Sequence, residues 1–257
     1  MNGEILNFYY EKILGGDNHV SFKLPIYKVK FSEYESLIEA INEKLPALRK
    51  QLEKNNDATD GGVQNTNVFT GNFQRYNVGY FDESEIFLKF REFIKKHTVK
   101  YYRILYNKNP DSKISYACWL NELNQFERIG WHKHQEFYGQ EGRQVNISAN
   151  MSLCIPSEKP TYTIYYSPLH CAWWQKTQSM QPKELDRILY ETHFDDRIDY
   201  NTPALCIQNV PGLFTFFPSF LGHETTQVML NETRVSLGLD FFLEPQDRED
   251  ISSLFPL

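Results

Sequence analysis

The spacing of apolar residues changes twice along this chain of 257 residues. From residue 4 to 31, apolar and polar positions alternate in short runs, a period of two that is typical of strands. From about residue 32 to 105, apolar residues recur every three to four positions, as they do along one face of a helix. Beyond residue 113 the short β-like runs return, separated by Pro, Gly and Asn.

Two helices are predicted in the first half of the chain. Ser32 opens the first with a capping-box pattern, and the helix is expected to run to about Pro46 and to continue, kinked, to Lys54. The second is expected to open at Asp82 and to reach about Leu105, because phenylalanines recur along it with a 3.6-residue rhythm.

Two features of this region, one between the helices and one within the second helix, have a plain structural interpretation. Residues 55–67 are polar and contain two adjacent glycines, which predicts a loop and is equally typical of a mobile flap beside a site. His97 falls in the second predicted helix next to Lys95 and Lys96. We expect it to be exposed or to act as a cap rather than to bind a metal.

The second half of the chain predicts a sheet-rich core. The β-like runs are 114–129, 145–155, 161–167, 204–209, 213–218 and 233–243. Because helices come first and strands afterwards within one chain, we expect an α+β layout in which two helices brace a β-sandwich. The expected organisation is one domain over 1–257, with a support region (1–113), the strand-rich core (114–243) and a C-terminal tail (244–257).

Composition narrows the function classes. Hydrophobic residues make up 41% of the chain and aromatic residues 15%, which is enough to fill one sizeable core. A net charge of −6 disfavours nucleic acid as a partner, because phosphate binding needs clustered Lys and Arg. No apolar run approaches the ~20 residues of a membrane span, and no secretory pattern opens the chain, so a cytoplasmic location is expected. The cysteines form no CxxC pair and are expected to be reduced thiols.

A histidine cluster offers two overlapping sets of metal ligands. In His132-Lys-His134-Gln-Glu136, residues two positions apart point to the same side of an extended chain. Both His134 with Glu136 and His132 with His134 therefore satisfy the geometry of a ligand pair. A polar surface patch is the plainer interpretation, but His223, at the end of a later apolar strand, supplies a distant third ligand.

Residues beyond His223 are suited to binding an anion. In the strand that begins at Arg234, the residues Arg234, Ser236 and Gly238 share one face. A buried Arg needs an anionic partner, and its guanidinium can hold a carboxylate bidentately while Ser236 adds a hydroxyl. The alternative is a structural ion pair between Arg234 and an Asp or Glu.

A polar strand face follows the first histidine cluster. Asn146, Ser148, Asn150 and Ser152 alternate with apolar residues, so this face lies either in water or along a wet cavity. In the second case Asn146 and Asn150 are candidates for binding a co-substrate or substrate. His193-Phe-Asp195 also has the spacing of a ligand pair, but it lies too close to His223 in the sequence to leave room for the intervening strands.

The order of these motifs resembles the Fe(II)/2-oxoglutarate-dependent dioxygenase superfamily. Its pattern is His-x-Asp/Glu, a distant His, and an Arg about ten residues later followed by x-Ser; the matching residues here are His134, Glu136, His223, Arg234 and Ser236. The stretch that follows His134 is similar to the prolyl-hydroxylase-like branch, and the Phe-Pro-Ser-x-Leu-x-His element is similar to small uncharacterised oxygenases of bacteria and phages. The resemblance covers roughly residues 114–243.

The resemblance implies a double-stranded β-helix (jelly-roll) core and a hydroxylase activity. Fe(II) would be held by His134, Glu136 and His223, and the co-substrate 2-oxoglutarate by Arg234 and Ser236. Such enzymes use O2 to oxidise a C–H bond, here of a peptide side chain, an amino acid or a small metabolite.

Two alternatives remain open at the level of sequence. If His132 is the first ligand, the site has three histidines, as in cupin-type metal enzymes that do not use 2-oxoglutarate. The chain could also be a jelly-roll binding protein without turnover.

Overall fold

The protein was analysed as a computed structural model, in which residues 3–13, 19–54, 63–68, 71–77, 84–110, 113–134, 137–138, 143–155, 159–166, 204–229, 231–244 and 255–256 are described. The first half contributes β1 (Glu4–Ile13), β2 (His19–Lys30), α1 (Tyr34–Lys54), β3 (Val63–Val68), β4 (Gly71–Asn77) and α2 (Glu85–Tyr106). The second half contributes β5 (Lys113–Leu123), β6 (Phe137–Tyr138), β7 (Arg143–Cys154), β8 (Tyr162–Tyr166), β9 (Ala204–Gln208), β10 (Leu213–Pro218), β11 (His223–Thr225), β12 (Arg234–Glu244) and β13 (Phe255–Pro256).

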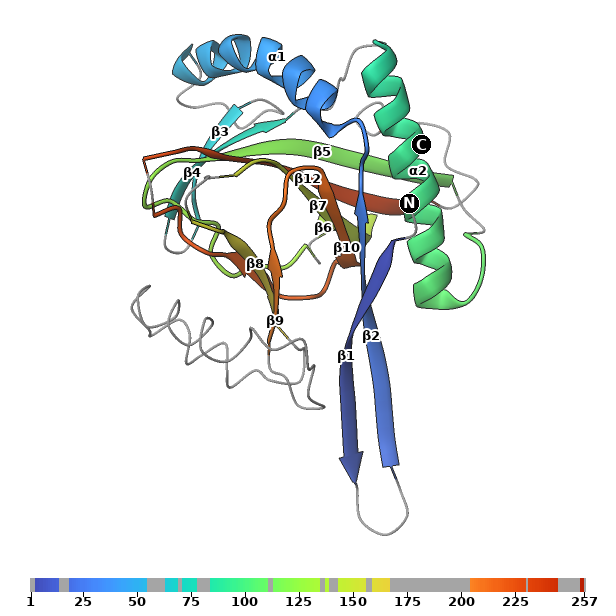
Figure 1. The fold of residues 1–257 in the computed structure, drawn as a ribbon. Helices are drawn as coiled ribbons and strands as arrows, with labels where there is room; N and C mark the ends of the chain where they lie inside the picture. Colours follow the sequence, from blue (N-terminus) through green and yellow to red (C-terminus); the bar gives the residue numbers. More distant parts are fainter. Residues whose placement is uncertain are drawn as a thin grey trace.

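The strands form two antiparallel sheets that lie over each other. The large sheet has the order β1-β2-β10-β7-β12-β5-β4-β3, with β6 paired to β7 and β13 paired to β5. The small sheet has the order β11-β8-β9. Figure 1 shows the small sheet on one side of the large sheet and the helices on the other. This sandwich with N-terminal helices confirms the α+β jelly-roll expectation.

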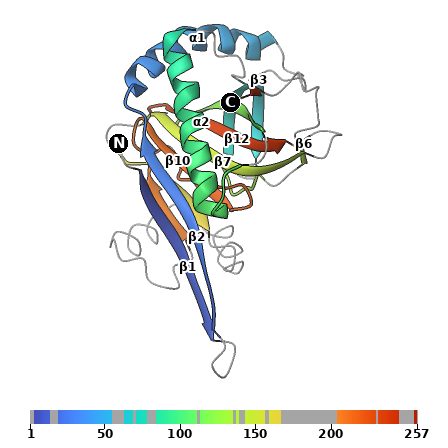
Figure 2. The same cartoon turned by 90° about the vertical axis from the view of Figure 1, so that its right-hand side faces the viewer.

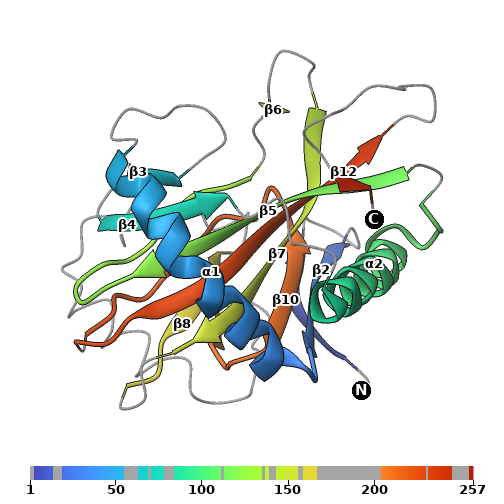
Figure 3. The same cartoon turned by 90° about the horizontal axis from the view of Figure 1, so that it is seen from above.

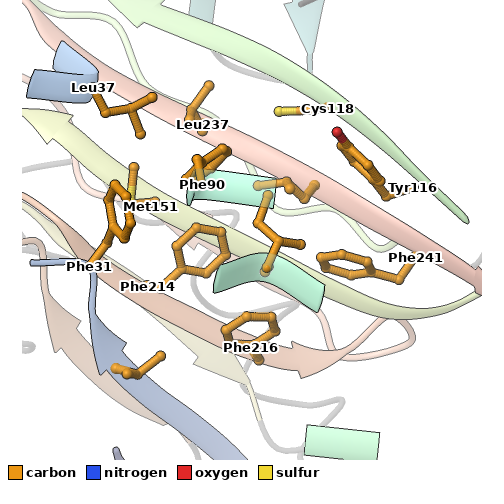
Figure 4. Packing of buried hydrophobic residues seen from close by; sticks show 14 of the residues in the cluster. Phe31, Leu37, Phe90, Tyr116, Cys118, Met151, Phe214, Phe216, Leu237 and Phe241 are labelled. Carbon is orange, nitrogen blue, oxygen red and sulfur yellow. The ribbon is translucent and has the colours of Figure 1, made fainter. Parts of the chain in front are cut away.

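The helices α1 and α2 cover the outer face of the large sheet. Seen from above, α1 runs obliquely over the strands from β3 and β4 towards β10, and α2 lies beside β2 at a wide angle to α1 (Figure 3). The largest apolar cluster lies between these helices and the sheet, and it includes Leu37 and Phe90 from the helices and Phe214, Leu237 and Phe241 from the strands (Figure 4). The opposite face of the large sheet, which meets the small sheet, is therefore left for other chemistry.

The hairpin of β1 and β2 extends well beyond the sandwich, as Figure 2 shows. Its two strands pair in register from Glu4 opposite Lys28 to Ile13 opposite His19. Only the base of the hairpin joins the rest of the large sheet, where Leu213–Phe216 of β10 pair with β2. The described strands before position 113 thus share one sheet with β5, β7, β10 and β12. The predicted domain boundaries stay a prediction.

Several local predictions differ from the structure. The predicted loop over 55–67 contains the start of β3, an edge strand whose polar sequence carries no apolar alternation. The second helix begins at Glu85 with Ser84 as its N-cap, whereas the predicted start lies outside the described residues. The first helix continues through Pro46, as expected. The predicted run 114–129 ends as a strand at Leu123.

His97 is buried rather than exposed, which corrects its predicted role. It is 6% exposed, and its Nδ1 lies 2.8 Å from the hydroxyl oxygen of Tyr27. Burial, and then the neighbouring Lys96 and Lys100, lower the pKa of His97 to about 4. His97 therefore belongs to the apolar core beneath α2 as a neutral side chain.

Two further expectations concern the whole chain. No helix in the described part of the chain is long and apolar enough to span a membrane. Cys118, Cys154 and Cys206 are free thiols, as predicted. Cys171 lies outside the described residues.

Candidate metal centre

Backbone pairing brings the three histidines His132, His134 and His223 together from distant parts of the chain. His132 and His223 form an isolated antiparallel bridge, in which each amide donates to the other's carbonyl at 3.0 Å. The amide of His134 donates to the carbonyl of Ser219 at 2.9 Å. The segment that follows β5 is thus attached to the turn between β10 and β11, and this attachment sets the position of all three imidazoles.

The three imidazoles present nitrogen atoms to one point. One ring nitrogen from each of the three lies within 4.8 Å of the others. The Nε2 atoms of His132 and His134 are 3.0 Å apart. This is the arrangement of a facial set of ligands, because a metal at the common point would lie within bonding reach of all three nitrogens.

Hydrogen bonds at the far side of each ring fix its orientation. The Nδ1 atom of His132 lies 2.8 Å from the carbonyl of Gly130, and that of His223 lies 3.0 Å from the carbonyl of Leu221. The Nδ1 atom of His134 lies 2.6 Å from Oδ1 of Asp240. Carbonyl and carboxylate oxygens only accept, so each Nδ1 carries the proton and each Nε2 keeps its lone pair for a metal.

Burial keeps His223 in the neutral form that metal binding needs. His223 is 5% exposed, and burial lowers its pKa well below the usual range of a histidine. The nearby His132 and His134 lower that pKa further, while the bond to the carbonyl of Leu221 acts in the opposite direction. A neutral imidazole is the ligand form, so this environment favours metal binding over protonation.

The structure brings together His134 and His223, with His132 as the third member of the group. Glu136, the carboxylate in the predicted ligand set, lies outside the described residues, as do His193 and Asp195. The predicted set of His134, Glu136 and His223 stays a prediction. Of the two overlapping alternatives in the sequence, the three-histidine set is the one that the described geometry displays.

Arg234 is buried, and no described residue forms with it the ion pair that would make it purely structural. The residue is 2% exposed, and its Nε and Nη1 atoms have no hydrogen-bond partner among the described residues. Burial lowers the pKa of the guanidinium to about 10, an effect that Tyr165 partly offsets. A guanidinium at this pKa is charged at neutral pH, and leaving its donors unpaired in the interior is costly. No ion pair from a described residue to Arg234 is present.

The polar face of β7 points into the interior rather than into water. Ser148 and Ser152 are buried, and the amide of Asn150 donates to the hydroxyl of Tyr165 on the small sheet at 2.8 Å. Asn146 is half-buried, and its backbone carbonyl accepts a hydrogen bond from Ser219. The space between the two sheets is therefore polar, as a cavity for a co-substrate would require.

β12 supplies a matching polar face next to β7. Ser236 lies opposite Ser152, Gly238 opposite Asn150 and Asp240 opposite Ser148. Ser236 is buried on the same face as Arg234, as predicted. Asp240, which the sequence analysis did not single out, completes this row, and continuing the alternation from Arg234 by six residues would have found it.

Two glycines allow indole rings to approach the histidines. A Cβ at Gly238 would lie 2.5 Å from the indole of Trp119, and one at Gly222 would lie 2.6 Å from the indole of Trp131. Trp119 in turn stacks on the ring of His134, with a centroid distance of 5.6 Å. The absence of side chains at these glycines is therefore a packing requirement of the site.

Comparisons with known proteins add evidence on the fold. No protein-family model and no curated protein sequence matches this chain. Among solved structures it is similar to the non-haem alpha-ketoglutarate-dependent carbocyclase SnoK from nogalamycin biosynthesis, with 11% identity, a TM-score of 0.50, and coverage of 90% of this chain and 91% of that one.

Two prolyl hydroxylases are also similar in structure. One is a prolyl-4-hydroxylase from Pseudomonas putida, with 10% identity, a TM-score of 0.49, and coverage of 85% of this chain and 92% of that one. The other is the collagen prolyl hydroxylase of Paramecium Bursaria Chlorella virus-1, with 9% identity, a TM-score of 0.49, and coverage of 85% and 96%.

The similarity to SnoK shows that the chain has the double-stranded β-helix fold found in 2-oxoglutarate-dependent Fe(II) oxygenases. At 11% identity the likeness concerns the fold alone. What the chain does has to be argued from its site.

Proposed function

We propose that this protein is a non-haem Fe(II)/2-oxoglutarate-dependent oxygenase that hydroxylates a C–H bond of a peptide side chain, an amino acid or a small metabolite. The observation that carries the proposal is Arg234, a buried guanidinium with unpaired Nε and Nη1 donors. It lies on the same face of β12 as Asp240, which contacts the histidine group. A cation without a partner at this position calls for an anionic ligand.

The surroundings of Arg234 suit a carboxylate. A guanidinium holds a carboxylate with two parallel hydrogen bonds, and Ser236 on the same face adds a hydroxyl. Tyr165 accepts a hydrogen bond from Asn150, and its hydroxyl is also hydrogen-bonded to the side chain of Thr215. A dicarboxylate lying along this face would have one end at Arg234 and the other directed towards the histidines.

The histidine group fits a first-row transition metal. Imidazole nitrogen suits iron as well as zinc, copper and nickel, and three protein ligands leave positions for other molecules. His132, His134 and His223 would hold the metal, and Glu136 remains the alternative ligand that the sequence predicts. Bound Fe(II) would supply the activation of O2 and the binding of the keto acid, while the chain itself orients both and keeps the space between the sheets closed to bulk water.

A second candidate function is favoured by the ligand set. Three imidazoles directed at one point are the ligand set typical of cupin-type metal enzymes that do not use 2-oxoglutarate. Such an enzyme would not need the unpaired Arg234. A jelly-roll binding protein without turnover, the third alternative in the sequence analysis, would bind the ligand but release no product.

The test is an anaerobic titration of the protein with Fe(II) and 2-oxoglutarate, followed by absorption. We expect the weak visible charge-transfer band of the metal chelate and, in air, succinate release. Arg234→Met should weaken 2-oxoglutarate binding by about 30-fold or more, because the substitution removes a buried charged partner. Arg103→Met, at an exposed arginine on α2, is the matched control and should behave as wild type.

Each alternative has its own outcome in this experiment. A band with normal 2-oxoglutarate affinity in Arg234→Met would contradict the role of Arg234. Metal binding without any band or succinate would select the three-histidine enzyme that does not use 2-oxoglutarate. A band without succinate, with or without candidate substrates, would select the binding protein.

The identity of the third ligand is a separate question with a separate test. If His132, His134 and His223 form the set, His132→Ala should release the metal and Glu136→Gln should retain it. The reverse pattern would select the predicted set of His134, Glu136 and His223. Metal content after gel filtration, measured by atomic emission, distinguishes the two.

A further inference from the structure

Asp240 is the most deeply buried charged residue near the histidine group. Its side chain is fully enclosed, with 0% exposure. Its Oδ1 atom accepts hydrogen bonds from Nδ1 of His134 at 2.6 Å and from the hydroxyl of Ser148 at 2.7 Å. Two donors from β7 and from the histidine segment thus converge on one carboxylate oxygen of β12.

This contact makes the three histidines unequal. His132 and His223 donate from Nδ1 to the carbonyls of Gly130 and Leu221, which are neutral acceptors. His134 donates to a carboxylate. A charged acceptor makes a shorter and stronger hydrogen bond than a neutral one, and it draws the Nδ1 proton away from the ring. The Nε2 atom of His134 is therefore the most electron-rich of the three donors.

The charge of the site also depends on Asp240. Two histidines and a carboxylate carry one negative charge among the ligands, whereas three histidines carry none. Asp240 is hydrogen-bonded to Nδ1 of His134, on the side of the ring away from the common point. The three-histidine group therefore has one negative charge that is separated from a ligand by only one hydrogen bond. In the interior such a charge acts on a cation far more strongly than it would in water.

We propose that Asp240 is a positioning residue that holds His134 towards the metal and supplies, from behind that histidine, the negative charge that the three imidazoles lack. Ser148 orients the carboxylate for this task. The inference rests on the proposed metal centre and deepens it. It concerns metal affinity and the electronic character of the centre, and it applies with or without 2-oxoglutarate.

A second buried carboxylate of the molecule provides the comparison that a test requires. Glu224 follows His223 directly, is 6% exposed, and accepts a hydrogen bond from the hydroxyl of Tyr166. The donor to Glu224 is thus a phenol rather than an imidazole. Glu224→Gln removes a buried carboxylate close to the site without touching the partner of His134, so it controls for loss of charge in general.

The experiment uses Co(II) as the probe with the full-length protein. Co(II) binding is followed by its visible absorption and by emission of Trp119, which stacks on His134. Asp240→Asn keeps the shape and an acceptor but removes the charge; we expect Co(II) affinity to fall about 10- to 100-fold, with a shifted Co(II) spectrum. Ser148→Ala should show a smaller loss with a shift in the same direction. Glu224→Gln should resemble wild type.

The possible results separate this inference from the proposed function. Wild-type protein that binds no Co(II) would overturn the metal centre itself. Wild-type protein that binds Co(II), with Asp240→Asn equal to it in affinity and spectrum, would overturn only the role of Asp240. Equal losses in Asp240→Asn and Glu224→Gln would also overturn it, because the effect would then be one of buried charge in general. If Asp240→Asn does not fold, an unchanged affinity and spectrum in Ser148→Ala would do so.

Discussion

The two faces of β12 are equally buried but built from opposite chemistry. Towards the helices it presents Val235, Leu237, Leu239 and Phe241, which belong to the main apolar cluster. Towards the small sheet it presents Arg234, Ser236, Gly238 and Asp240, all of them buried as well. Burial alone therefore does not distinguish a core from a site. A row of polar residues that is as buried as the apolar row is typical of a binding site from which the fold excludes water.

The largest expected effect is on the apolar face and should spare the site. Phe241→Ala removes a side chain that is 1% exposed and stacks with Phe216, so we expect a loss of about 3–5 kcal/mol in the free energy of unfolding. The Co(II) affinity of the remaining folded protein should be unchanged. Urea denaturation and metal titration check the two halves of this prediction; a parallel loss of affinity would show that the two faces are not independent.

On the polar face we expect a substitution to raise the stability of the ligand-free protein instead of lowering it. Arg234→Met replaces a buried guanidinium, with two unpaired donors, by an apolar side chain of similar length. We expect the ligand-free protein to become more stable by about 1–3 kcal/mol, while binding of 2-oxoglutarate weakens by about 30-fold or more. Thermal denaturation with and without 2-oxoglutarate measures both. A less stable ligand-free variant would mean that Arg234 is structural after all.

Gly238 tests how tightly the polar face is packed. A Cβ at this position would lie 2.5 Å from the Trp119 indole, so Gly238→Ala should cost about 1–3 kcal/mol of stability through overpacking. Because Trp119 stacks on His134, the substitution should also change tryptophan emission and weaken Co(II) binding. Unchanged emission together with wild-type affinity would argue against this contact.

A further prediction concerns His97, a histidine on the helix side of the sheet. The pKa of His97 is lowered to about 4 in the folded protein, against roughly 6.5 in the unfolded chain. Between these values the unfolded chain binds a proton that folded His97 does not, so stability is complete above pH ~6.5 and is lost as the pH falls.

His97→Gln removes this titration. The slope of unfolding free energy against pH should therefore decrease by up to about 1.4 kcal/mol per pH unit between pH ~6 and ~4.5. Urea denaturation across this range measures the slope. His223, whose pKa is also lowered, should leave a residual slope of the same sign. Identical slopes in wild type and variant would refute the assignment to His97.

Local patterns were sufficient to predict most of the fold. The strands β7, β8, β9, β10 and β12 were predicted because each is a short run with turn residues at both ends. β3 was missed because its polar sequence owes its conformation to pairing with β4. The burial of His97 does not follow from its neighbours Lys95 and Lys96. It follows from helical spacing, because Phe90, Ile94 and Tyr101 lie on the same face of α2 and are all buried.

The site was predictable only in part, for a geometric reason. Arg234 and Ser236 followed from the alternation along one strand, and His134 and His223 from their separation. The sequence does not decide between His132 and Glu136 as a ligand. Both lie two positions from His134, so both point to the same side of an extended chain as His134 does. Contacts between strands that are distant in sequence decide such a case. The bond of His134 to Asp240, 106 positions away, is of that kind.

The reciprocal backbone pairing of His132 and His223 has a consequence for folding. It closes a loop of about ninety residues, whose chain-length contribution to closure entropy is ~4 kcal/mol. Ligands supplied by both ends of this loop converge only after both sheets have formed. A metal ion that binds only the folded form, at a free concentration of about 1,000 times its Kd, would add ~4 kcal/mol of stability. This gain offsets the entropy contribution of loop closure. Metal supply would then govern not only activity but also the fraction of chains that resist opening and proteolysis.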